Sequence, residues 1–282
     1  MNTTTAPATP AHPATTASAP AEAARALLAR ALRLVSRIAF PVASILGLWY
    51  LAIAFSGLPE FVIPRPTQVL AVLTNETSFV TQHLVVTLKA AALGFLFANI
   101  VGISLAVLFT SLGIFQRLLM PAAITLRNVP YVALASVLVL AVGDGLWTKV
   151  IIVTIAGFFP VLVNTMRGLR SVDTVVLDRM RILDVSPWKV FLKVRLPYSV
   201  PYILAAQEIT GSGSIIVAIA AEWMISSEGL GYVINRAMAQ YRGDQVYAVA
   251  LLAAVLSYSI YMLVQVIGAR INWSERAREG KR

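Results

Sequence analysis

The sequence predicts an all-α integral membrane protein with six transmembrane helices. Hydrophobic residues make up 58% of its 282 residues and charged residues only 13%, and the mean hydropathy is +0.78. Six apolar stretches approach the roughly 20 residues that a helix needs to cross a hydrocarbon core about 30 Å thick. Lysine and arginine gather in alternate connecting segments, as cytoplasmic loops do. A soluble globular protein is excluded on this composition.

The first predicted span is the apolar run 38–56. Residues 1–24 before it are almost entirely Ala, Pro, Thr and Ser, a mixture that predicts a disordered tail. Arginines at 25, 30, 33 and 37 give the run the look of a signal peptide. The run is too long for one, and no small-residue cleavage site is obvious after it, so we expect an uncleaved span.

Five further spans are expected at about 84–110, 118–142, 149–166, 200–224 and 247–269. The span 118–142 is interrupted by Arg127, Asn128 and Pro130. Such groups persist at membrane depth only where protein or a watery cavity receives them. In the span 84–110, Gly94, Ala98 and Gly102 follow at intervals of four, which predicts a close helix contact.

Charge predicts the orientation of the spans. With the amino terminus inside, 18 of the 23 lysines and arginines fall on the cytoplasmic side. The other five, Arg65, Lys89, Lys149, Arg236 and Arg242, fall outside or at outer helix ends. Cytoplasmic loops are enriched in these residues, so both termini are expected in the cytoplasm. The same topology accounts for the net charge of +10 better than binding to nucleic acid does.

The largest predicted cytoplasmic loop covers about 167–199 and contains two short helices, 174–183 and 187–195. Asp173 is placed to cap the first helix. Ser186 and Pro187 suit the cap and the first position of the second, and Asp184 falls in the turn between them. Helices this short are marginal alone. They either pack on each other and the membrane face, or dock on a soluble partner.

Five stretches of the chain carry a resemblance to a known family: IPRPTQVL (63–70), TLKAAALGFLFANIVGISLAVL (87–108), GFFPVLVNTMRGLRSVD (157–173), FLKVRLPYSVPYIL (191–204) and AEWMISSEGLGYVI (221–234). With them the sequence resembles the permease subunits of binding-protein-dependent ABC importers, in the branch that includes nitrate, sulfonate, taurine, bicarbonate and pyrimidine-precursor systems. The resemblance covers about residues 60–275. It implies an importer-type fold, with a pair of ATP-binding subunits, a solute-binding protein, a second permease subunit and membrane lipid as partners.

The resemblance also identifies the loop as the one that couples the spans to the ATPase. The family motif in this loop is Glu-Ala-Ala, three residues, Gly, nine residues, Ile, one residue and Leu-Pro. Here its spacing is kept, with Asp178-Arg179-Met180 in place of Glu-Ala-Ala, Asp184 in place of Gly and Val194 in place of Ile. Asp enters left-handed turns at low cost. The implied coupling residues are Asp178, Arg179, Arg181, Asp184, Ser186, Pro187, Trp188, Lys189, Leu196 and Pro197. These departures leave open whether the second permease subunit is identical or carries a fuller motif.

No catalytic site is expected in this chain. It contains no G-x-x-x-x-G-K-[ST] phosphate loop, so ATP must be hydrolysed by another subunit and no cofactor is expected here. Cysteine is absent, which excludes thiolate metal sites and cysteine nucleophiles. His12 and His83 are not spaced to share a metal ion.

Polar residues within the spans are candidates for the solute path, because they are costly in lipid and tend to face a cavity. The candidates are Asn128, Asn164, Glu208, Ser212 and Glu222. Two alternatives stay open: Glu208 pairs with Arg167, Arg170 or Lys193, and the asparagines bond their own helices.

The expected function is solute import driven by ATP. Members of the branch often carry Arg where this chain has Glu208 and Gly213, so a neutral or heteroaromatic solute is favoured over a small anion. The alternatives are a secondary transporter or channel that works without ATP, and a membrane scaffold. The first is disfavoured because six spans show no convincing inverted repeat and the charged loop would lack a role. The second is disfavoured because a scaffold would not need polar residues in the fifth span.

Overall fold

The structure is a computed structural model that describes residues 39–271. The chain divides into two compact units, 1–58 and 59–282, which are described separately. The predicted tail at 1–24 and the basic residues before position 38 and after position 271 lie outside the described residues. Within 39–271 the regular structure is helical throughout, which confirms the predicted all-α class.

The first unit contributes one described helix, α1 (Ala39–Ser56). None of its 18 residues is buried within the protein. Its apolar side chains are open, with Phe40 at 74% and Phe55 at 85% exposure. A helix this long with apolar residues on every side is suited to lipid, in agreement with the first predicted span.

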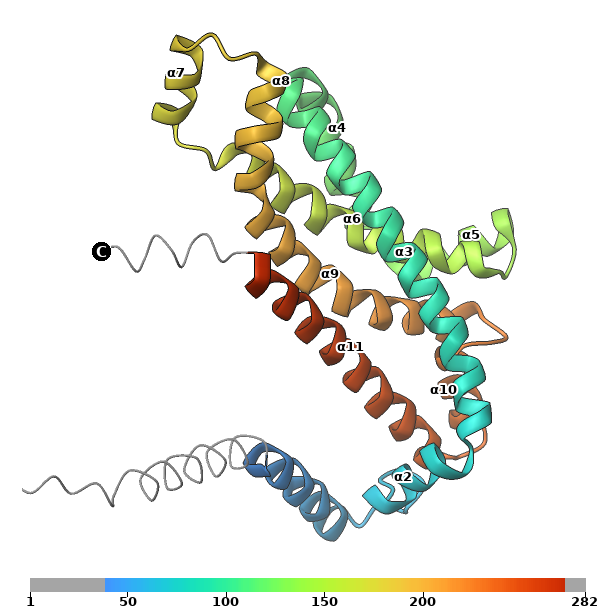
Figure 1. Cartoon of the computed structure of the whole chain (residues 1–282). Coiled ribbons are helices and arrows are strands. Elements are labelled where there is room, and N and C mark those ends of the chain that lie inside the picture. Colours follow the sequence, from blue (N-terminus) through green and yellow to red (C-terminus); the bar gives the residue numbers. More distant parts are fainter. Residues whose placement is uncertain (1–38, 272–282) are drawn as a thin grey trace, which may run out of the picture. The chain divides into compact units, whose positions relative to one another are not determined.

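The second unit contains the remaining helices (Figure 1). In chain order they are α2 (Pro66–Asn75), α3 (Thr77–Ser111), α4 (Gly113–Arg127), α5 (Tyr131–Val142), α6 (Leu146–Arg170), α7 (Thr174–Ile182), α8 (Pro187–Val190), the π-helical turn η1 (Phe191–Arg195), α9 (Leu196–Ile225), α10 (Leu230–Ala239) and α11 (Gly243–Ile271). Among the described residues, five helical segments are long and apolar enough to cross a membrane: α1, α3, α6, the run from α8 through α9, and α11. They match five of the six predicted spans.

The remaining predicted span, 118–142, is not one continuous helix. It is divided between α4 and α5, with the break at Asn128 and Pro130. Pro130 has no N–H to donate and disfavours helical backbone in the residue before it, so the helix ends there. The Arg127 guanidinium lies over the Phe159 ring of α6, 4.6 Å from its centre. This cation–π contact gives the charge of Arg127 a favourable partner.

The centre of the second unit is a close packing of α3, α6 and α9. Gly94 faces α6 so closely that a Cβ atom there would lie 2.4 Å from the Cβ of Val153. A Cβ on Gly102 would lie 2.8 Å from Val161, and one on Gly157 would lie 2.9 Å from Ala98. The close contact predicted from the small residues of α3 is therefore confirmed, and α6 is the partner.

The other helices cover this centre. α11 and α10 pack on α9, α5 packs on α6, and α2 packs on α11. Between α10 and α11, Arg242 bonds Glu76 at 2.7 Å and Asp244 at 2.8 Å. These two carboxylates raise the pKa of the Arg242 guanidinium. The ion pairs tie the α2–α3 junction to the start of α11.

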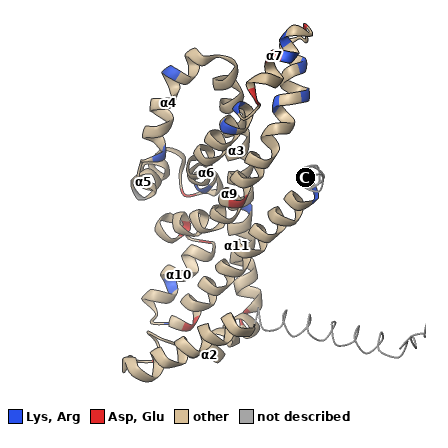
Figure 2. Cartoon of the chain, turned by 90° about the vertical axis from the view of Figure 1, so that its left-hand side faces the viewer, with Lys and Arg blue, Asp and Glu red and all other residues tan. Residues whose placement is uncertain are grey.

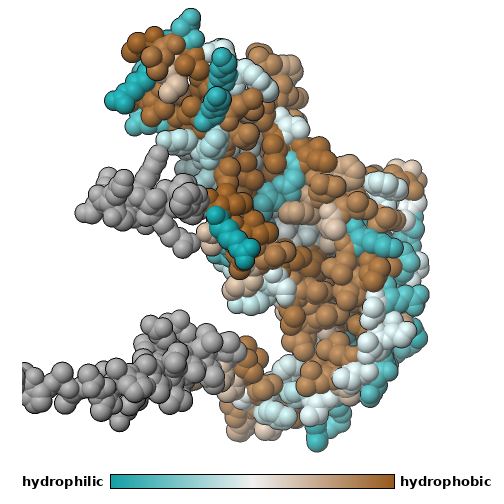
Figure 3. Space-filling view, in the orientation of Figure 1, coloured by the Kyte–Doolittle hydropathy of each residue, from teal (hydrophilic) through white to brown (hydrophobic). Residues whose placement is uncertain are grey.

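The two ends of the second unit differ in character. Basic side chains gather around α7, at the end of the unit opposite α2 and α10 (Figure 2). Hydrophobic side chains cover most of the middle of the face drawn in Figure 3, and hydrophilic ones lie toward both ends. This is the pattern expected of a membrane domain whose middle lies in lipid and whose one end is strongly charged.

Candidate coupling surface and solute path

The first loop helix, α7, begins where the sequence predicts. It covers Thr174–Ile182, and the side chain of Asp173 accepts a hydrogen bond from the backbone N–H of Val175 at 2.9 Å. This bond satisfies one of the donors that a helix leaves free at its start. The predicted Asp173 cap is confirmed.

Asp184 forms the turn that ends α7. Its φ is +50°, in the left-handed region. The N–H of Asp184 bonds the carbonyl of Arg181, and the N–H of Val185 bonds the carbonyl of Met180, both at 3.0 Å. This pair of bonds is a Schellman motif, in which glycine usually takes the left-handed position. The predicted role of Asp184 as a substitute for glycine is confirmed.

The second predicted helix begins at Pro187, as expected, but it does not end at residue 195. Pro187 occupies the first position of α8 and Ser186 the cap position, although the Ser186 side chain makes no capping bond. From Pro187 the helix continues through η1 into α9 and reaches Ile225, 39 residues in all. At η1 the N–H of Leu196 bonds the carbonyl of Phe191, five residues back. This wide turn lies directly before Pro197, which has no N–H for the regular ladder.

The loop exposes its apolar side chains. No residue of α7 is buried, and Ile182, Leu183 and Trp188 are 84%, 68% and 67% exposed. The Trp188 ring stacks on Phe191, with centroids 5.7 Å apart, rather than covering α7. The two loop helices therefore do not bury each other's apolar side chains, which was one of the two predicted arrangements.

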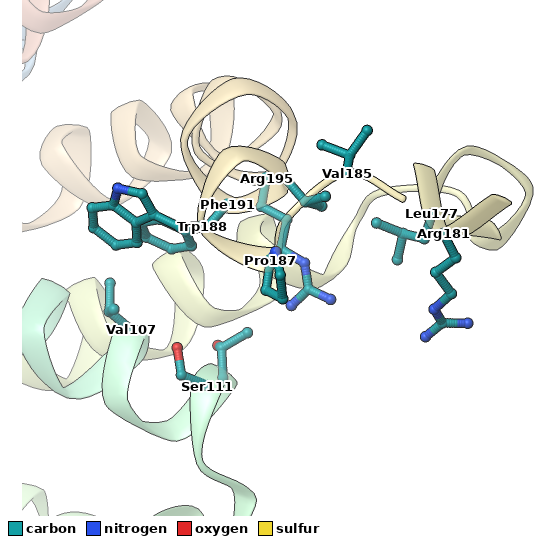
Figure 4. A pocket seen from close by; sticks show the side chains of 11 residues that line it. Val107, Ser111, Leu177, Arg181, Val185, Pro187, Trp188, Phe191 and Arg195 are labelled. Carbon is teal, nitrogen blue, oxygen red and sulfur yellow. The ribbon is translucent and has the colours of Figure 1, made fainter. Parts of the chain in front are cut away.

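All ten residues assigned to coupling from the sequence are exposed. Arg181 bonds Asp178 at 2.7 Å, but the pair is so open that it adds at most about 1 kcal/mol to stability. Behind the loop is a cavity of about 490 Å³, whose lining includes Val107 and Ser111 at the end of α3 and Trp188 and Arg195 on the loop side (Figure 4). The exposed surface of the loop thus contains both charged side chains, such as Arg181, and apolar ones, such as Trp188.

The predicted path residues lie in several environments. Asn164 donates to the carbonyl of Pro160 at 2.8 Å, and the Ser212 hydroxyl donates to the carbonyl of Glu208 at 2.6 Å, so both bond their own helices. Asn128 is exposed at the end of α4. Glu208 is half-buried, and no ion pair to Arg167, Arg170 or Lys193 occurs in the described part of the chain.

One face of α9 is open along its length. Tyr202, Ile209, Ile216 and Trp223 follow at intervals of seven and are 39%, 59%, 59% and 46% exposed. A spacing of seven places them on one side of the helix. Gly213 lies beside them, and a Cβ there would meet no atom of residues 39–271 within 4 Å. Glu208 and Ser212 flank this open face.

Glu222 lies elsewhere. Its side chain is 0% exposed, and one carboxylate oxygen accepts bonds from the Thr87 hydroxyl at 2.7 Å and from the N–H of Gly231 at 3.1 Å. In this subunit it is not on the open face of α9. Neither Thr87 nor the helix α10 that follows Gly229 was predicted from the sequence. The Gly-Leu-Gly at 229–231 is the signal that marks a close backbone approach there.

Comparison with known proteins decides the family. Residues 98–273 match the model of the binding-protein-dependent transport system inner membrane component. The chain belongs to this family. It is 30% identical over 233 residues to a probable ABC transporter permease protein of Haemophilus influenzae, covering 83% of this chain and 95% of the relative.

A second relative and a solved structure agree with that membership. The formylaminopyrimidine transport permease ThiX of Halalkalibacterium halodurans is 28% identical over 211 residues, 74% of this chain and 84% of the relative. A chain of the inward-facing MetNI methionine ABC transporter has the same fold, with a TM-score of 0.64 at 16% identity over 70% of this chain and 98% of that one. The protein is thus a membrane permease subunit of an ABC importer.

Proposed function

We propose that this permease subunit receives a small solute from a separate binding protein and is driven by a separate pair of ATPase subunits docked on the α7–α8 loop. The observation that carries the proposal is the exposure of Ile182, Leu183 and Trp188. Ile182 ends the nine-residue helix α7, Leu183 is its C-cap, and Trp188 lies on α8. Apolar side chains open to this degree on and beside such short helices need a partner surface to become stable. Since the chain has no phosphate loop, an ATPase is the partner that an ABC importer requires at this surface.

The proposed orientation places the loop and both termini in the cytoplasm of a bacterial cell, with the chain in the inner membrane. The charge bias supports it, because 18 of the 23 lysines and arginines then lie inside. The family description names an inner membrane component, which agrees with that location. In this orientation α2 and α10, at the far end of the unit from α7, face outward (Figure 1).

The proposed solute path runs along the open face of α9, between this subunit and a second permease subunit, identical or different. Supporting this, Ile209, Gly213 and Ile216 leave the middle of the face unobstructed. Glu208 and Ser212 place polar groups at its edge, and Asn128 lies exposed at the break in the α4–α5 pair. Polar groups beside an open helix face are typical of a passage that a hydrated solute can enter.

The proposed solute is neutral or heteroaromatic. The acidic side chain of Glu208 at the edge of the open face disfavours a small anion. The name of the ThiX relative, a formylaminopyrimidine permease, is compatible with a heteroaromatic solute.

Purification of the tagged chain from its source membrane tests the proposal. An ATPase subunit and a binding protein should co-purify, and mass spectrometry of the binding protein should find a neutral or heteroaromatic molecule. The variant Leu183→Glu should lower recovery of the ATPase by about tenfold, since it places a charge in the proposed contact. Leu112→Glu, at an apolar residue that is 49% exposed outside the loop, is the matched control.

Three results would contradict the proposal. Recovery of the ATPase that is unchanged by Leu183→Glu would remove the loop as its docking surface. A small inorganic anion as the bound molecule would remove the proposed solute class. Purified chain that moves the solute in liposomes without ATP would favour the secondary-transporter alternative instead.

A further inference from the structure

The start of α10 is held by side chains from two other helices. The first N–H groups of a helix have no partner within it. Here three of them in succession are satisfied from outside. The N–H of Gly229 donates to Nδ1 of His83 at 3.0 Å, that of Leu230 to the Thr87 hydroxyl at 2.9 Å, and that of Gly231 to a Glu222 carboxylate oxygen at 3.1 Å. His83 and Thr87 belong to α3 and Glu222 to α9. We call these three side chains the α10 clamp.

The members of the clamp depend on one another. Thr87 accepts a hydrogen bond from Leu230 and donates one to Glu222 at 2.7 Å, and both side chains are 0% exposed. Removal of either leaves buried polar groups of the other helices without a partner, which is more costly than the loss of an exposed bond. The second oxygen of Glu222 is buried and has no protein partner among the described residues, so the clamp relies on the first.

The backbone of the α9–α10 loop lies directly on Glu222 and α9. Gly229 has a φ of +98°, and a Cβ on it would fall 2.2 Å from the Glu222 carboxyl carbon. A Cβ on Gly231 would fall 2.2 Å from the carbonyl oxygen of Ile219. The same loop reaches α6, where the carboxylate of Glu228 lies 3.8 Å from the buried ammonium of Lys149. The start of α10 therefore has no room to shift against α9.

Glu222 also lies on the helix that reaches the coupling loop. The helical run from Pro187 to Ile225 has 39 residues. At 1.5 Å per residue it is about 58 Å long, with Trp188 near one end and Glu222 near the other. Glu222 thus joins α10 to one end of this run, and the run begins in the α7–α8 loop.

We propose that Glu222 is a positioning residue whose clamp carries a contact made on α10 by the binding protein into α9 and from there to the coupling loop. This inference rests on the partners and orientation proposed above. On its open side α10 presents Asn235 and Met238 to such a contact. Coupling between distant sites requires a packed element with two conformations, whose equilibrium is shifted by binding at either site.

The test uses the complete transporter in liposomes, with the binding protein and the small molecule that co-purifies with it. Basal ATP hydrolysis and hydrolysis stimulated by the loaded binding protein are measured for wild type, Glu222→Leu, Glu222→Gln and Thr87→Val. Hydrogen exchange of the amides of 229–239 reports whether α10 is held. Thr165→Val is the matched control, because Thr165 is buried and its hydroxyl has no hydrogen-bond partner within the described part of the chain.

The clamp predicts that Glu222→Leu and Thr87→Val increase exchange in α10 and reduce the stimulated rate about threefold to tenfold, with the basal rate nearly unchanged. Glu222→Gln should restore stimulation, because its carbonyl oxygen can still accept from Thr87 and Gly231. If Glu222→Leu does not assemble, the milder Thr87→Val decides.

Three results would overturn the inference. The first is faster exchange in α10 with undiminished stimulation, which would make the clamp purely structural. The second is loss of stimulation in Glu222→Gln as well, which would assign the effect to charge. The third is normal exchange and stimulation in Glu222→Leu and Thr87→Val. Failure of the wild type to respond to the binding protein would instead contradict the function proposed above.

Discussion

Gly94 shows how a single residue sets the separation between α3 and α6. Its hydrogen faces Val153, and a Cβ would come within 2.4 Å of that side chain's own Cβ. The Thr154 hydroxyl on α6 also bonds the carbonyl of Gly94 at 3.3 Å. Without a hydrophobic driving force in lipid, such close approach supplies most of the attraction between spans.

Replacement of this glycine should loosen the pair. Gly94→Ala is expected to destabilise the subunit by roughly 1–3 kcal/mol, the cost of overpacking a tight contact. The midpoint of thermal unfolding in detergent should fall by about 3–10 °C. Gly113→Ala is the control, since a Cβ there meets no atom of the described chain within 4 Å. Equal midpoints for the two variants would contradict this view of the contact.

At the residue scale, local features were predictable and distant ones were not. The cap formed by Asp173 and the left-handed Asp184 depend on neighbours a few residues away, so the sequence was enough to find both. Glu222 depends on Thr87, 135 positions earlier in the chain. A carboxylate is costly to place in lipid, so position 222 was predicted to face the solute path. Its distant partner Thr87 is not evident from the sequence.

At the scale of elements, the connections between helices differ most from expectation. Apolar length alone predicted 118–142 as one span, whereas Pro130 divides it into α4 and α5. The second loop helix (187–195) and the fifth span (200–224) were predicted as separate helices, whereas η1 joins them into one helical run. Periodicity reports which residues are apolar. It does not report whether the helix axis continues through a proline.

The turn between α7 and α8 allows a direct test of the coupling element. Asp184→Gly should keep the turn, because glycine adopts positive φ without cost. Asp184→Val should cost about 1–2 kcal/mol, since a β-branched residue is strained there. We expect about tenfold weaker binding of the ATPase subunit to Asp184→Val than to Asp184→Gly, measured by titration in detergent. Equal affinities would show that the orientation of α7 does not matter for docking.

At the scale of the whole molecule, one long helical run joins the two ends of the second unit. The α7–α8 loop and the α10 clamp lie at opposite ends of the run formed by α8, η1 and α9, and α3 contributes to both ends through Ser111 and Thr87. Fold class and most spans followed from composition and charge, and the coupling role expected of the α7–α8 loop followed from the family resemblance. The clamp required the structure, because it is formed by the ends of three helices that are distant in sequence.

The central claim is that the exposed loop contacts an ATPase, and site-specific crosslinking tests it most directly. A photoreactive amino acid is placed at Ile182, on the loop, and separately at Met238, on α10, which is 56% exposed. The complex is irradiated in its source membrane and the adducts are identified by mass spectrometry. We predict an ATPase adduct from Ile182 and none from Met238. Crosslinks from Ile182 to lipid alone, or an ATPase adduct from Met238, would contradict the account.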